Sequence, residues 1–553
     1  MRLPRSLSKI ELIVIVIAFL GAFYSQSWAL LNRYVVNNDV TQNIYWMQQF
    51  KDGGLFRDDL LTEFAQNFQP WGFTLFYRFF SLWMHPYHLS KILPILLLAV
   101  SALFIFRLVS TFADEFAGFF AASVFVLTPM YITRMAGGQA RAFGIPLLIL
   151  FLHHFIKKSY LISSMVLFLQ SQFYPIVFLP SFLAFALSFV TIKNRRLALN
   201  AEKKKLVFFL TTALLCSTLL GLKYYEFRNP AIGSIVVKKD MINKPEYYQE
   251  GRHQILPVTP VSYVVVRQIY HGCYLLDQAN KFLHRLRIPT FRSLLVLVFL
   301  GIFFLVKIWN RKLMIPPELY SVALSGILLY WLSDRLLLRL YMPDRYIEYT
   351  IAPVILIISG GAIGHSISNI RIVTLRKGVQ FAAVVFFCAS FGLIKDAGLE
   401  DFSRYRGLYE RTSVLSKAAM VAAHPYLADG IPTFSFRKVF VNYELSHPWY
   451  DTYWETIKAR TIDFFNAYYA ENLDSVSAFF RKYRIDWLIL CRDHYSPEYL
   501  KKKKIYFEPF NSQILDSLRG RKKFILFDVF LKNSDEEYVL INKKDLSTAK
   551  SNL

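Results

Sequence analysis

Apolar segments long enough to cross a lipid bilayer, separated by short polar stretches, fill roughly the first 395 residues of the chain. A span through the hydrocarbon core takes about 20 apolar residues. The first such segment, Leu12–Leu31, follows a short basic stretch and carries bulky residues such as Trp28 near its end. A cleaved signal peptide has a shorter apolar core and small residues before its cleavage site. We therefore predict that Leu12–Leu31 is an uncleaved first span.

Further segments have the composition of a span, although several are short. They are Leu89–Phe106, Phe116–Tyr131, Ala142–Ile156, Leu206–Leu222, Leu294–Val306, Leu319–Leu332, Ile347–His365 and Val379–Ile394. Tyr160–Ile192 runs for about 33 residues without a charge. As one helix it would measure about 50 Å, which exceeds a bilayer core of about 30 Å. Because basic residues flank it on both sides, we predict that it crosses twice and turns near Ser171–Pro175, where the proline favours a break. The pattern thus predicts about eleven spans.

The short basic loops indicate the orientation. With a cytoplasmic N-terminus, every basic cluster falls on the cytoplasmic side, in agreement with the positive-inside bias. These clusters are Lys157–Lys158, Lys193–Lys205, Lys307–Lys312 and Arg371–Lys377. The opposite face then carries the long polar insertions, residues 32–88 and 223–291, together with everything after residue 395. Long loops between spans are usually functional, so we expect the working surface to be extracytoplasmic.

Residues 396–553 have a different pattern. Short β-like runs alternate with two stretches, Tyr453–Tyr469 and Leu473–Tyr483, whose apolar residues recur at helical spacing. The β-like runs are Ala419–Ala423, Lys438–Asn442, Asp486–Cys491, Phe524–Leu531 and Tyr538–Ile541. Such alternation predicts a soluble α/β domain. The expected fold class is therefore a polytopic α-helical membrane protein, residues 1–395, followed by a C-terminal soluble α/β domain, residues 396–553.

Composition agrees with this class. The chain has 553 residues, of which 54% are hydrophobic and 19% charged, whereas soluble proteins carry about 25% charged residues. A net charge of +25 would suggest nucleic acid as the partner of a soluble protein. In a membrane protein the positive-inside bias explains it, so we expect contact with membrane lipids and no nucleic acid. The four cysteines are scattered, and neither a disulfide framework nor a zinc site is expected.

Asp39 stands directly after the first span, in the stretch NNDVTQNIYWMQQF. Two interpretations are open. Aspartate is a favoured N-cap, so Asp39 can begin a short helix along the membrane interface. A carboxylate at this boundary can also act as a general base that takes a proton from an acceptor hydroxyl. The two roles are compatible, because a capping carboxylate is held rigidly.

The same loop continues with LFRDDLLTEF, which supplies Arg57, Asp58 and Asp59. A solvated pair of loop acids is a simpler explanation of Asp58 and Asp59 than a catalytic pair. His85 and His88 lie three positions apart, and packing at the interface explains them better than metal binding. We therefore assign no metal-ligating residue.

The stretch GGQARAF opens the fourth predicted span. Gly137 and Gly138 allow a tight turn or a close backbone approach. Arg141 then lies in the first turn of a helix that runs back into the membrane. A helix N-terminus attracts anions, and a guanidinium adds a bidentate phosphate contact. Snorkelling of Arg141 toward lipid headgroups is an equally weighted alternative.

The stretch LRLYMPDRYIEY lies between two predicted spans on the same outer face. It places Asp344 and Arg345 at the start of a helix, and an ionisable pair at membrane depth indicates a functional site. The simpler alternative is a helix cap in contact with lipid. Arg335 and Arg339 add further positive charge to this turn. Because such charge runs against the positive-inside bias, we expect an anionic ligand here.

Together, the first span, an outer loop that opens with an acid, about eleven spans and an outer soluble domain resemble the C-type glycosyltransferase superfamily (GT-C). The stretches NNDVTQNIYWMQQF, QARAFG, PDRYIEY and AAHPYLADGIPTFSFRKVFVNYELSHPWYDTYWETIKARTIDFFNAYYA are most similar to a bacterial branch of it. Members take a sugar from a polyprenyl-phosphate or polyprenyl-diphosphate carrier on the outer side of the membrane. An aspartate of the first outer loop acts as base or orients the acceptor, and the matching residue is Asp39. Many members have two adjacent acids there, where this chain has Asn38–Asp39. A divalent metal therefore stays an open option, and no other cofactor is implied.

The resemblance implies one inverting displacement at the outer face of a bacterial inner membrane. The acceptor hydroxyl, deprotonated by Asp39, attacks the anomeric carbon while the lipid phosphate leaves. Fixed cations stabilise the leaving charge, and the residues expected in this role are Arg141, Arg345 and Arg57. The residues expected to bind substrate are Asp58, Asp59, Gln139, Asp344 and Tyr346. The partners are then a polyprenyl-phosphate sugar and an acceptor that is a glycan, a lipid or a protein.

Two other functions are alternatives to this one. A transporter or flippase of a lipid-linked sugar predicts charges or breaks at mid-span, often in duplicated halves. The sequence shows few mid-span charges and no duplication. A non-catalytic envelope assembly protein would leave the side chains of Asp39 and Arg141 free to vary. The sequence favours the enzyme.

Overall fold

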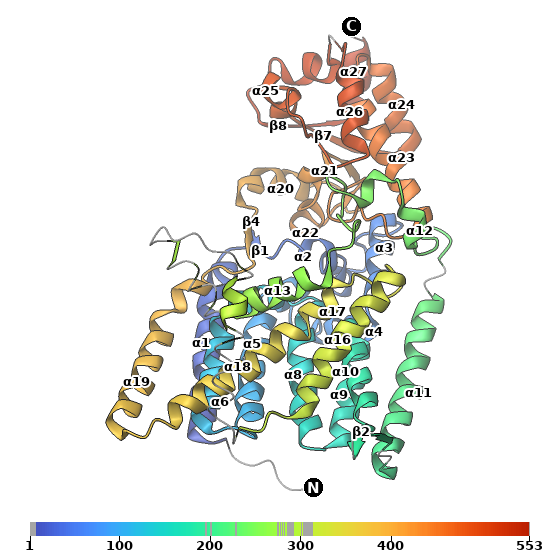
Figure 1. The fold of residues 1–553 in the computed structure, drawn as a ribbon. Coiled ribbons are helices and arrows are strands. Elements are labelled where there is room, and N and C mark those ends of the chain that lie inside the picture. The colour runs from blue at the N-terminus through green and yellow to red at the C-terminus, as the bar shows by residue number, and fades with distance from the viewer. Residues whose placement is uncertain are drawn as a thin grey trace.

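The computed structural model describes most of the chain. The described residues are 7–193, 196–199, 202–226, 229–273, 313–521 and 523–551, with 276, 278, 280, 283, 284, 292, 294–299 and 301 between them. The basic loop Lys307–Lys312 and part of the predicted span Leu294–Val306 lie outside these residues. Helices dominate the fold and form a bundle at one end, with a sheet-containing region at the other (Figure 1). The N-terminus lies at the bundle end and the C-terminus at the far end.

Five described helical stretches are long and apolar enough to cross a membrane. They are α1 (Lys9–Leu31), α5 (Pro86–Val109), α11 (Lys203–Glu226), Asp344–Ser368 with α17 (Asp344–Glu348) and α18 (Ile351–Ser368), and α19 (Val373–Ala389). The pair α6 (Glu115–Leu127) and α7 (Pro129–Met135), bent by 64°, makes a sixth if it counts as one span. Five or six spans support a multi-pass membrane protein, and the predicted number of about eleven is not confirmed.

The difference arises where the predicted spans are short. Residues 142–192 form α8 (Gly144–Ile156), α9 (Tyr160–Phe173) and α10 (Pro175–Leu187), which have only 13, 14 and 13 residues. Helices of this length fall below the roughly 20 residues that cross a bilayer core. The chain breaks at Tyr174, inside the segment where the sequence predicts a turn. Proline at the first position of α10 lacks the N–H that a continuous helix would need.

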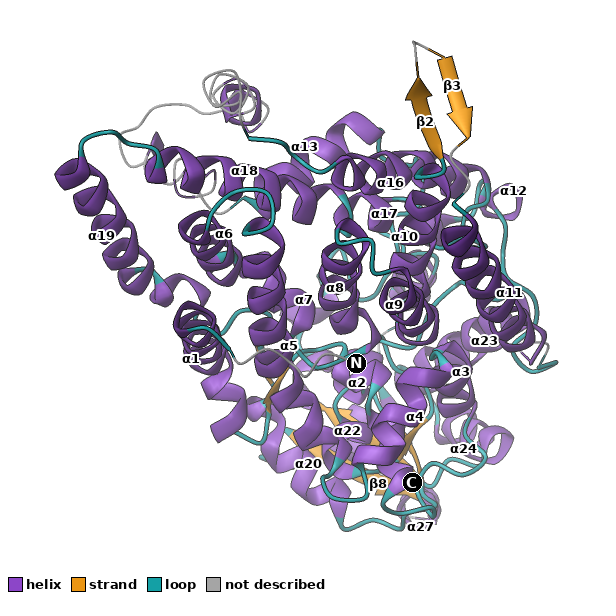
Figure 2. Ribbon diagram, turned by 90° about the horizontal axis from the view of Figure 1, so that it is seen from below, coloured by secondary structure: helices purple, strands orange, loops and turns teal. Residues whose placement is uncertain are grey.

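Local sequence signals explain where the helices begin. Ser8 and Glu11 form a capping box at the start of α1, with each side chain bonded to the other's backbone N–H. Asp114 caps α6 by accepting a bond from the backbone N–H of Ala117. Small residues allow α6 and α18 to pack closely, because a Cβ added at Gly364 would lie 2.6 Å from the Cα of Ala117. In Figure 2 these helices lie inside the bundle, whereas α11 and α19 lie at its opposite edges.

The first outer loop lies between the bundle and the C-terminal region (Figure 1). It contains β1 (Val35–Val36), α2 (Val40–Asn43), the 3₁₀ helix η1 (Tyr45–Phe50), α3 (Leu60–Phe68) and α4 (Trp71–Phe80). Strand β1 pairs antiparallel with β4 (Glu400–Asp401), which aligns Val35 with Asp401. Residues about 360 positions apart in the chain are thereby joined directly beside Asp39.

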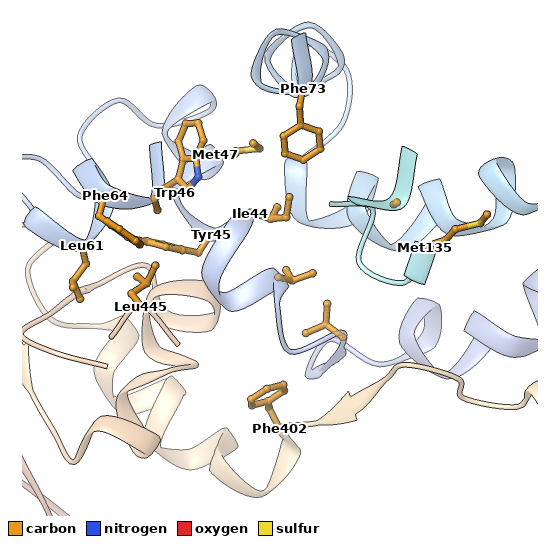
Figure 3. Close-up of a cluster of buried hydrophobic side chains, with 14 of the residues drawn as sticks. Ile44, Tyr45, Trp46, Met47, Leu61, Phe64, Phe73, Met135, Phe402 and Leu445 are labelled. Atoms are coloured by element: carbon orange, nitrogen blue, oxygen red, sulfur yellow. The ribbon is translucent and has the colours of Figure 1, made fainter. Parts of the chain in front are cut away.

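Buried aromatic side chains hold this loop against the C-terminal region (Figure 3). Phe64 of α3 stacks on Tyr453, with ring centroids 4.1 Å apart and planes at 11°. Tyr45 contacts Phe56 edge to face at 5.3 Å, and Leu445 of the C-terminal region joins the same cluster. Burial of each such aromatic ring contributes on the order of 1.5–3 kcal/mol. The loop is therefore packed as core rather than exposed as a flexible insertion.

The C-terminal region is built around a four-stranded sheet in the order β6-β5-β7-β8. Strand β5 (Met420–Ala422) lies parallel to β6 (Lys438–Val439) and β7 (Trp487–Cys491), and β8 (Tyr538–Asn542) runs antiparallel to β7. Its helices are α20 (Arg406–Ser413), α21 (Pro425–Ala428), α22 (Ile431–Ser435), α23 (Asp451–Tyr468), α24 (Leu473–Tyr483), α25 (Pro497–Leu500), α26 (Phe510–Leu518) and α27 (Lys543–Ser551). Four of the five predicted strands and both predicted helices are present. The boundary at residue 395 stays a prediction.

The fifth predicted strand, Phe524–Leu531, is wrong. Residues Phe527–Leu531 form a helix of π type instead. A short apolar run has no periodicity that separates a strand from a buried helix. Contacts across the fold decide between them: Phe524 lies 5.8 Å from the ring of Tyr469, and Phe527 lies 5.9 Å from the ring of Tyr495.

The remaining helices complete the outer face of the bundle. They are α12 (Lys238–Met241), α13 (Val261–Gly272) and α16 (Pro317–Arg335). A hairpin of β2 (Val190–Lys193) and β3 (Arg196–Leu199) occupies the predicted basic loop between α10 and α11.

Candidate functional site

Asp39 forms an ion pair with Arg141. The distance between Asp39 Oδ2 and Arg141 Nη2 is 2.6 Å, and the two side chains are 23% and 19% exposed. Asp39 occupies the N-cap position of α2, but its side chain makes no capping hydrogen bond to that helix, all of which the structure describes. The Asp39 carboxylate therefore does not cap α2, and it faces the Arg141 guanidinium instead. The structure brings together two charges that lie about 100 residues apart in the sequence.

Amide side chains fix this pair from one side. The Oδ1 atom of Asn37 accepts hydrogen bonds from Gln139 Nε2 at 2.7 Å and from Arg141 Nη2 at 3.4 Å. Asn43 Nδ2 donates to the backbone carbonyl of Asp39 at 2.9 Å and to Gln139 Oε1 at 3.3 Å. Gln139 is buried, with 3% of its surface exposed. It is thus placed to hold the loop of Asp39 against the loop of Arg141.

Two glycines permit the close approach of these loops. Gly137 and Gly138 have φ of +81° and +56°, a left-handed conformation that side chains disfavour. A Cβ at Gly137 would lie 2.8 Å from Cγ2 of Val40, the residue after Asp39. The predicted tight turn is therefore present, and it sets Arg141 against the first outer loop.

A second group of charges surrounds Arg345. Its Nη1 atom lies 3.0 Å from Oε2 of Glu348, and Arg134 pairs with the other oxygen of the same carboxylate. The side chain of Glu348 is only 3% exposed. Asp344 accepts a bond of 2.6 Å from Nη2 of Arg267. Three guanidinium groups and two carboxylates thus share one region.

These charged side chains line a cleft of about 780 Å³ between α7, α13 and α17. Arg134, Arg267 and Arg345 all contribute to its walls, together with Asp344 and Glu348. Three positive and two negative charges leave an excess of one positive charge. Guanidinium groups bind phosphate through paired hydrogen bonds, so the cleft has the chemistry of a phosphate site.

Tyr341 lies within electrostatic reach of both groups of charges. Burial raises the pKa of its hydroxyl, the positive charges of Arg345 and Arg141 lower it, and Asp39 and Glu348 raise it again. All four charges therefore act on one tyrosine hydroxyl, although the Asp39–Arg141 pair does not itself line the cleft.

The three other residues of the first outer loop that were predicted for the site lie away from Asp39. Arg57 is exposed and donates its Nε–H to the carbonyl of Gly53 at 2.9 Å. Asp58 is exposed, whereas Asp59 is buried and caps α3 by accepting from Thr62 N at 3.1 Å and Thr62 Oγ1 at 2.8 Å. Among the described residues, no contact joins Arg57, Asp58 or Asp59 to Asp39. The expected solvated acid pair thus consists of one solvated acid and one buried cap.

Tyr346 has a supporting position. It is buried, with 1% exposed, and its hydroxyl donates to the carbonyl of Leu340 at 2.7 Å. That bond closes the turn that carries Tyr341. Tyr346 therefore shapes the site rather than projecting into the cleft.

Sequence reasoning did not single out Arg134, Arg267 or Glu348. Glu348 stands inside the stretch PDRYIEY, and Arg134 lies three residues before the stretch GGQARAF. Their signal was the presence of an ionisable residue within an otherwise apolar segment, which indicates function by default. Arg267 carries the same signal, because it directly follows the apolar run Val264–Val266 in α13, but only the fold brings it to Asp344.

Two further acids lie within electrostatic reach of Asp39. Burial raises the pKa of Glu400, and the negative charge of Asp39 raises it further. Burial raises the pKa of Glu444 to about 7, Arg252 lowers it, and Asp39 raises it. Within the described part of the chain, no group of three or more His, Cys, Asp or Glu side chains is placed to hold a metal ion.

The C-terminal region also supports the turn that follows Asp39. His447 contacts the side chain of Gln42 in α2 through Nε2, and its Nδ1 lies 2.7 Å from Nε2 of His253. The ring of His447 stacks on Trp449 at 4.0 Å and 11°. Burial lowers the pKa of His253 to about 3, with Arg252 adding to the effect, so the ring is neutral near neutral pH. A loop and the C-terminal region together hold α2 in place.

Compared as a sequence, the chain matches no protein-family model and no curated protein. Compared as a fold, it is similar to structures of the oligosaccharyltransferase of Archaeoglobus fulgidus. The crystal structure with Zn and sulfate has a TM-score of 0.47 and 12% identity, and covers 88% of this chain and 69% of that chain. The apo form has a TM-score of 0.46 and 12% identity, and covers 89% of this chain and 70% of that chain. The complex with an inhibitory peptide and a dolichol-phosphate has a TM-score of 0.43 and 12% identity, and also covers 89% of this chain and 70% of that chain.

Proposed function

We propose that this protein is a membrane glycosyltransferase that moves a sugar from a polyprenyl-phosphate carrier to an acceptor hydroxyl with inversion at the anomeric carbon. The observation that carries the proposal is the pairing of Asp39 with Arg141 beside an arginine-lined cleft. A carboxylate and a cluster of guanidinium groups at one site are what a displacement with a phosphate leaving group requires.

Asp39 acts as the general base. The acceptor O–H approaches its carboxylate, and the oxygen forms a bond to the anomeric carbon as the bond from that carbon to the carrier phosphate breaks. The proton passes to Asp39, and the electron pair of the broken bond stays on the phosphate oxygen. Arg141, with Asn37 and Gln139 behind it, holds the carboxylate in position.

Arg345 binds the carrier phosphate, with Arg134 and Arg267 beside it. Glu348 and Asp344 orient these guanidinium groups before the phosphate arrives, because each carboxylate already accepts from one or two of them. Preorganised charge of this kind usually lowers the activation barrier more than any other single effect in an enzyme. The buried Nε–H of Arg141 has no hydrogen-bond partner among the described residues, and it adds a further donor close to the leaving group.

Arg57, Asp58 and Asp59 have no part in this proposal, because no contact joins them to Asp39 among the residues described. Gln139 and Tyr346 act as positioning residues. The acceptor is a glycan, a lipid or a protein, and a divalent metal is not required by the steps described. We place the enzyme in a bacterial inner membrane, with the N-terminus cytoplasmic and the C-terminal region extracytoplasmic.

The test is transfer from radiolabelled polyprenyl-phosphate sugars by purified protein. Asp39→Asn keeps the shape of the side chain and removes the base, so we expect transfer to fall by about 10²–10⁴-fold. Asp58→Asn is the matched control, since it neutralises an exposed acid of the same loop, and it should transfer normally. Unchanged transfer by Asp39→Asn would refute the assignment.

The same proteins separate the alternative functions. A transporter of lipid-linked sugar would move donor across vesicles without forming a glycosidic product. An assembly protein would support normal envelope glycans when Asp39 is replaced by Asn. Both outcomes differ from the loss of product that the proposal requires while the folded protein persists.

A further inference from the structure

An apolar groove lies between α9 and α11. These two helices lie side by side at one edge of the bundle (Figures 1 and 2). The groove has a volume of about 440 Å³, and its walls include Leu161, Met165 and Phe168 of α9 and Phe208, Thr212 and Leu215 of α11. Both helices belong to the apolar part of the chain. Helix α11 shows many apolar side chains on its surface, such as Leu214, which is 72% exposed. The groove therefore lies where hydrocarbon surrounds the protein.

The next turn of the same two helices opens into a second cavity. This cavity, of about 160 Å³, is lined by Gln172 of α9 and by Leu219 and Lys223 of α11. It extends to Tyr341 on the far side. The second cavity therefore begins about one turn beyond the groove along the same two helices, and Tyr341 lines its far side.

Positive charge lines the second cavity. Lys223 lies over the ring of Trp71, with its Nζ 5.7 Å from the centroid. Arg339 is exposed, and it forms no hydrogen bond or ion pair with any residue that the structure describes. An anionic group at the end of a hydrocarbon chain would meet both cations.

A third, polar cavity continues beyond Arg339. It has a volume of about 600 Å³, shares Arg339 and Ile235 with the second cavity, and includes Lys239, Asp451 and Trp454. The carboxylate of Asp451 can accept hydrogen bonds from sugar hydroxyls. The order from the groove to the third cavity is hydrocarbon, cation, then polar chamber, which matches the tail, anionic group and polar head of a glycolipid.

The second cavity and the arginine-lined cleft are lined by adjoining residues of one segment. Arg339 and Tyr341 line the second cavity, whereas Met342 and Arg345 line the cleft. In an inverting displacement the nucleophile enters on the side opposite the leaving group. A phosphate in the arginine-lined cleft therefore leaves the second cavity for the acceptor.

The residue that acts as base is also connected to the second cavity. Gln69 lines the second cavity, and its Nε2 donates to Asn43 Oδ1 at 2.6 Å. Asn43 in turn donates to the backbone carbonyl of Asp39 at 2.9 Å. The turn that carries Asp39 is thus bonded to the wall of that cavity, as a base that serves the acceptor requires.

We propose that the acceptor is an anionic lipid whose tail lies in the groove between α9 and α11 and whose headgroup lies in the second cavity, which Arg339 and Tyr341 line. This inference rests on the proposed function, and it deepens it by choosing a lipid among the acceptor classes. Transfer to such a lipid forms a glycosidic bond between its headgroup oxygen and the anomeric carbon, and the carrier phosphate is released.

The first experiment measures lipid binding independently of catalysis. Full-length protein in nanodiscs is irradiated with phosphatidylglycerol that carries a diazirine on its acyl chain, and separately with undecaprenyl phosphate that carries a benzophenone. We expect phosphatidylglycerol to label α9 and α11, and Thr212→Trp, which fills the groove, to reduce this labelling about tenfold. Leu214→Trp places the same side chain on the outer surface of α11 and should label normally. Labelling of the groove by undecaprenyl phosphate would assign it to the donor and overturn the proposal.

The second experiment identifies the product. Membranes are supplied with radiolabelled polyprenyl-phosphate sugar, and label is followed into organic-extractable lipid that survives mild acid, which cleaves sugar from polyprenyl phosphate. We expect Arg339→Gln to lower this product about tenfold, as the loss of one charged contact implies. Arg78→Gln, at an exposed cation of α4, should leave it unchanged. Label that appears only in protein or in water-soluble glycan would overturn the lipid acceptor but would still agree with a glycosyltransferase. Normal transfer by Asp39→Asn would instead refute the proposed function itself.

Discussion

Replacing Arg141 should weaken catalysis by an amount that follows from the geometry of its contacts. Its Nη2 atom lies 2.6 Å from Asp39, with both side chains less than a quarter exposed. The same atom donates to Asn37 at 3.4 Å. A hydrogen bond between charged groups contributes about 1.5–3 kcal/mol net. Arg141→Met removes both contacts and introduces no charge.

We expect Arg141→Met to raise the free energy of the transition state by about 2–3 kcal/mol, which lowers kcat/KM by roughly 30- to 160-fold. Arg141→Lys keeps the charge but loses the rigid guanidinium whose Nη2 reaches both partners, so we expect it to restore about half of that free energy. The assay is transfer from radiolabelled polyprenyl-phosphate sugar, with thermal unfolding in detergent as the check that each variant is folded.

A double-mutant cycle decides whether Asp39 and Arg141 act as one unit. If Arg141 works by holding the base, then Arg141→Met combined with Asp39→Asn should be little slower than Asp39→Asn alone. Losses that simply add would show that Arg141 contributes independently of Asp39. That result would refute the reasoning built on the ion pair.

Three further outcomes are expected. Burial raises the pKa of Glu444 from 4.5 to about 7. Between these two pH values the folded protein keeps a proton that the unfolded chain has lost, so the free energy of unfolding falls as the pH rises from 4.5 to about 7. Glu444→Gln should therefore raise the free energy of unfolding at about pH 8 by at most about 3 kcal/mol, and raise the thermal midpoint with it. At about pH 4 the midpoint should be unchanged, and a gain at both pH values would contradict this. Arg437 donates hydrogen bonds to four backbone carbonyls. Arg437→Met should therefore lower the free energy of unfolding by more than about 3 kcal/mol. A thermal midpoint like that of the wild type would show that these bonds contribute little. Asp59→Asn should keep the cap on Thr62 and retain both stability and transfer, while Asp59→Ala loses about 1 kcal/mol; loss of transfer in Asp59→Asn would return this residue to the substrate site.

Short local signals predicted much of the C-terminal region. The helix Leu473–Tyr483 has the bounds that its apolar spacing predicts, and the strand at Trp487–Cys491 lies within its predicted run. The run Phe524–Leu531 failed because a short apolar segment carries no period of its own. Its helical form depends on contacts with Tyr469 and Tyr495, which no local signal contains.

The candidate site divides in the same way. Asp39 and Arg141 stand out in the sequence from their places beside apolar segments, and the structure pairs them. Arg267 was not singled out, because nothing in its own helix points to Asp344, which lies 77 residues further along the chain. Asp58 and Asp59 are adjacent in the chain, yet one is exposed and the other is buried as a helix cap.

The sequence by itself determined the class of the protein: apolar length sets which segments suit hydrocarbon, and capping residues and prolines set where helices begin and break. Only the tertiary structure decided which charges meet, because Asp39 and Arg141 come from two separate segments. Their convergence depends on glycines that let two loops approach and on a pairing of β1 with β4 that spans most of the chain. Such contacts depend on packing between distant residues, and a linear pattern records only neighbours.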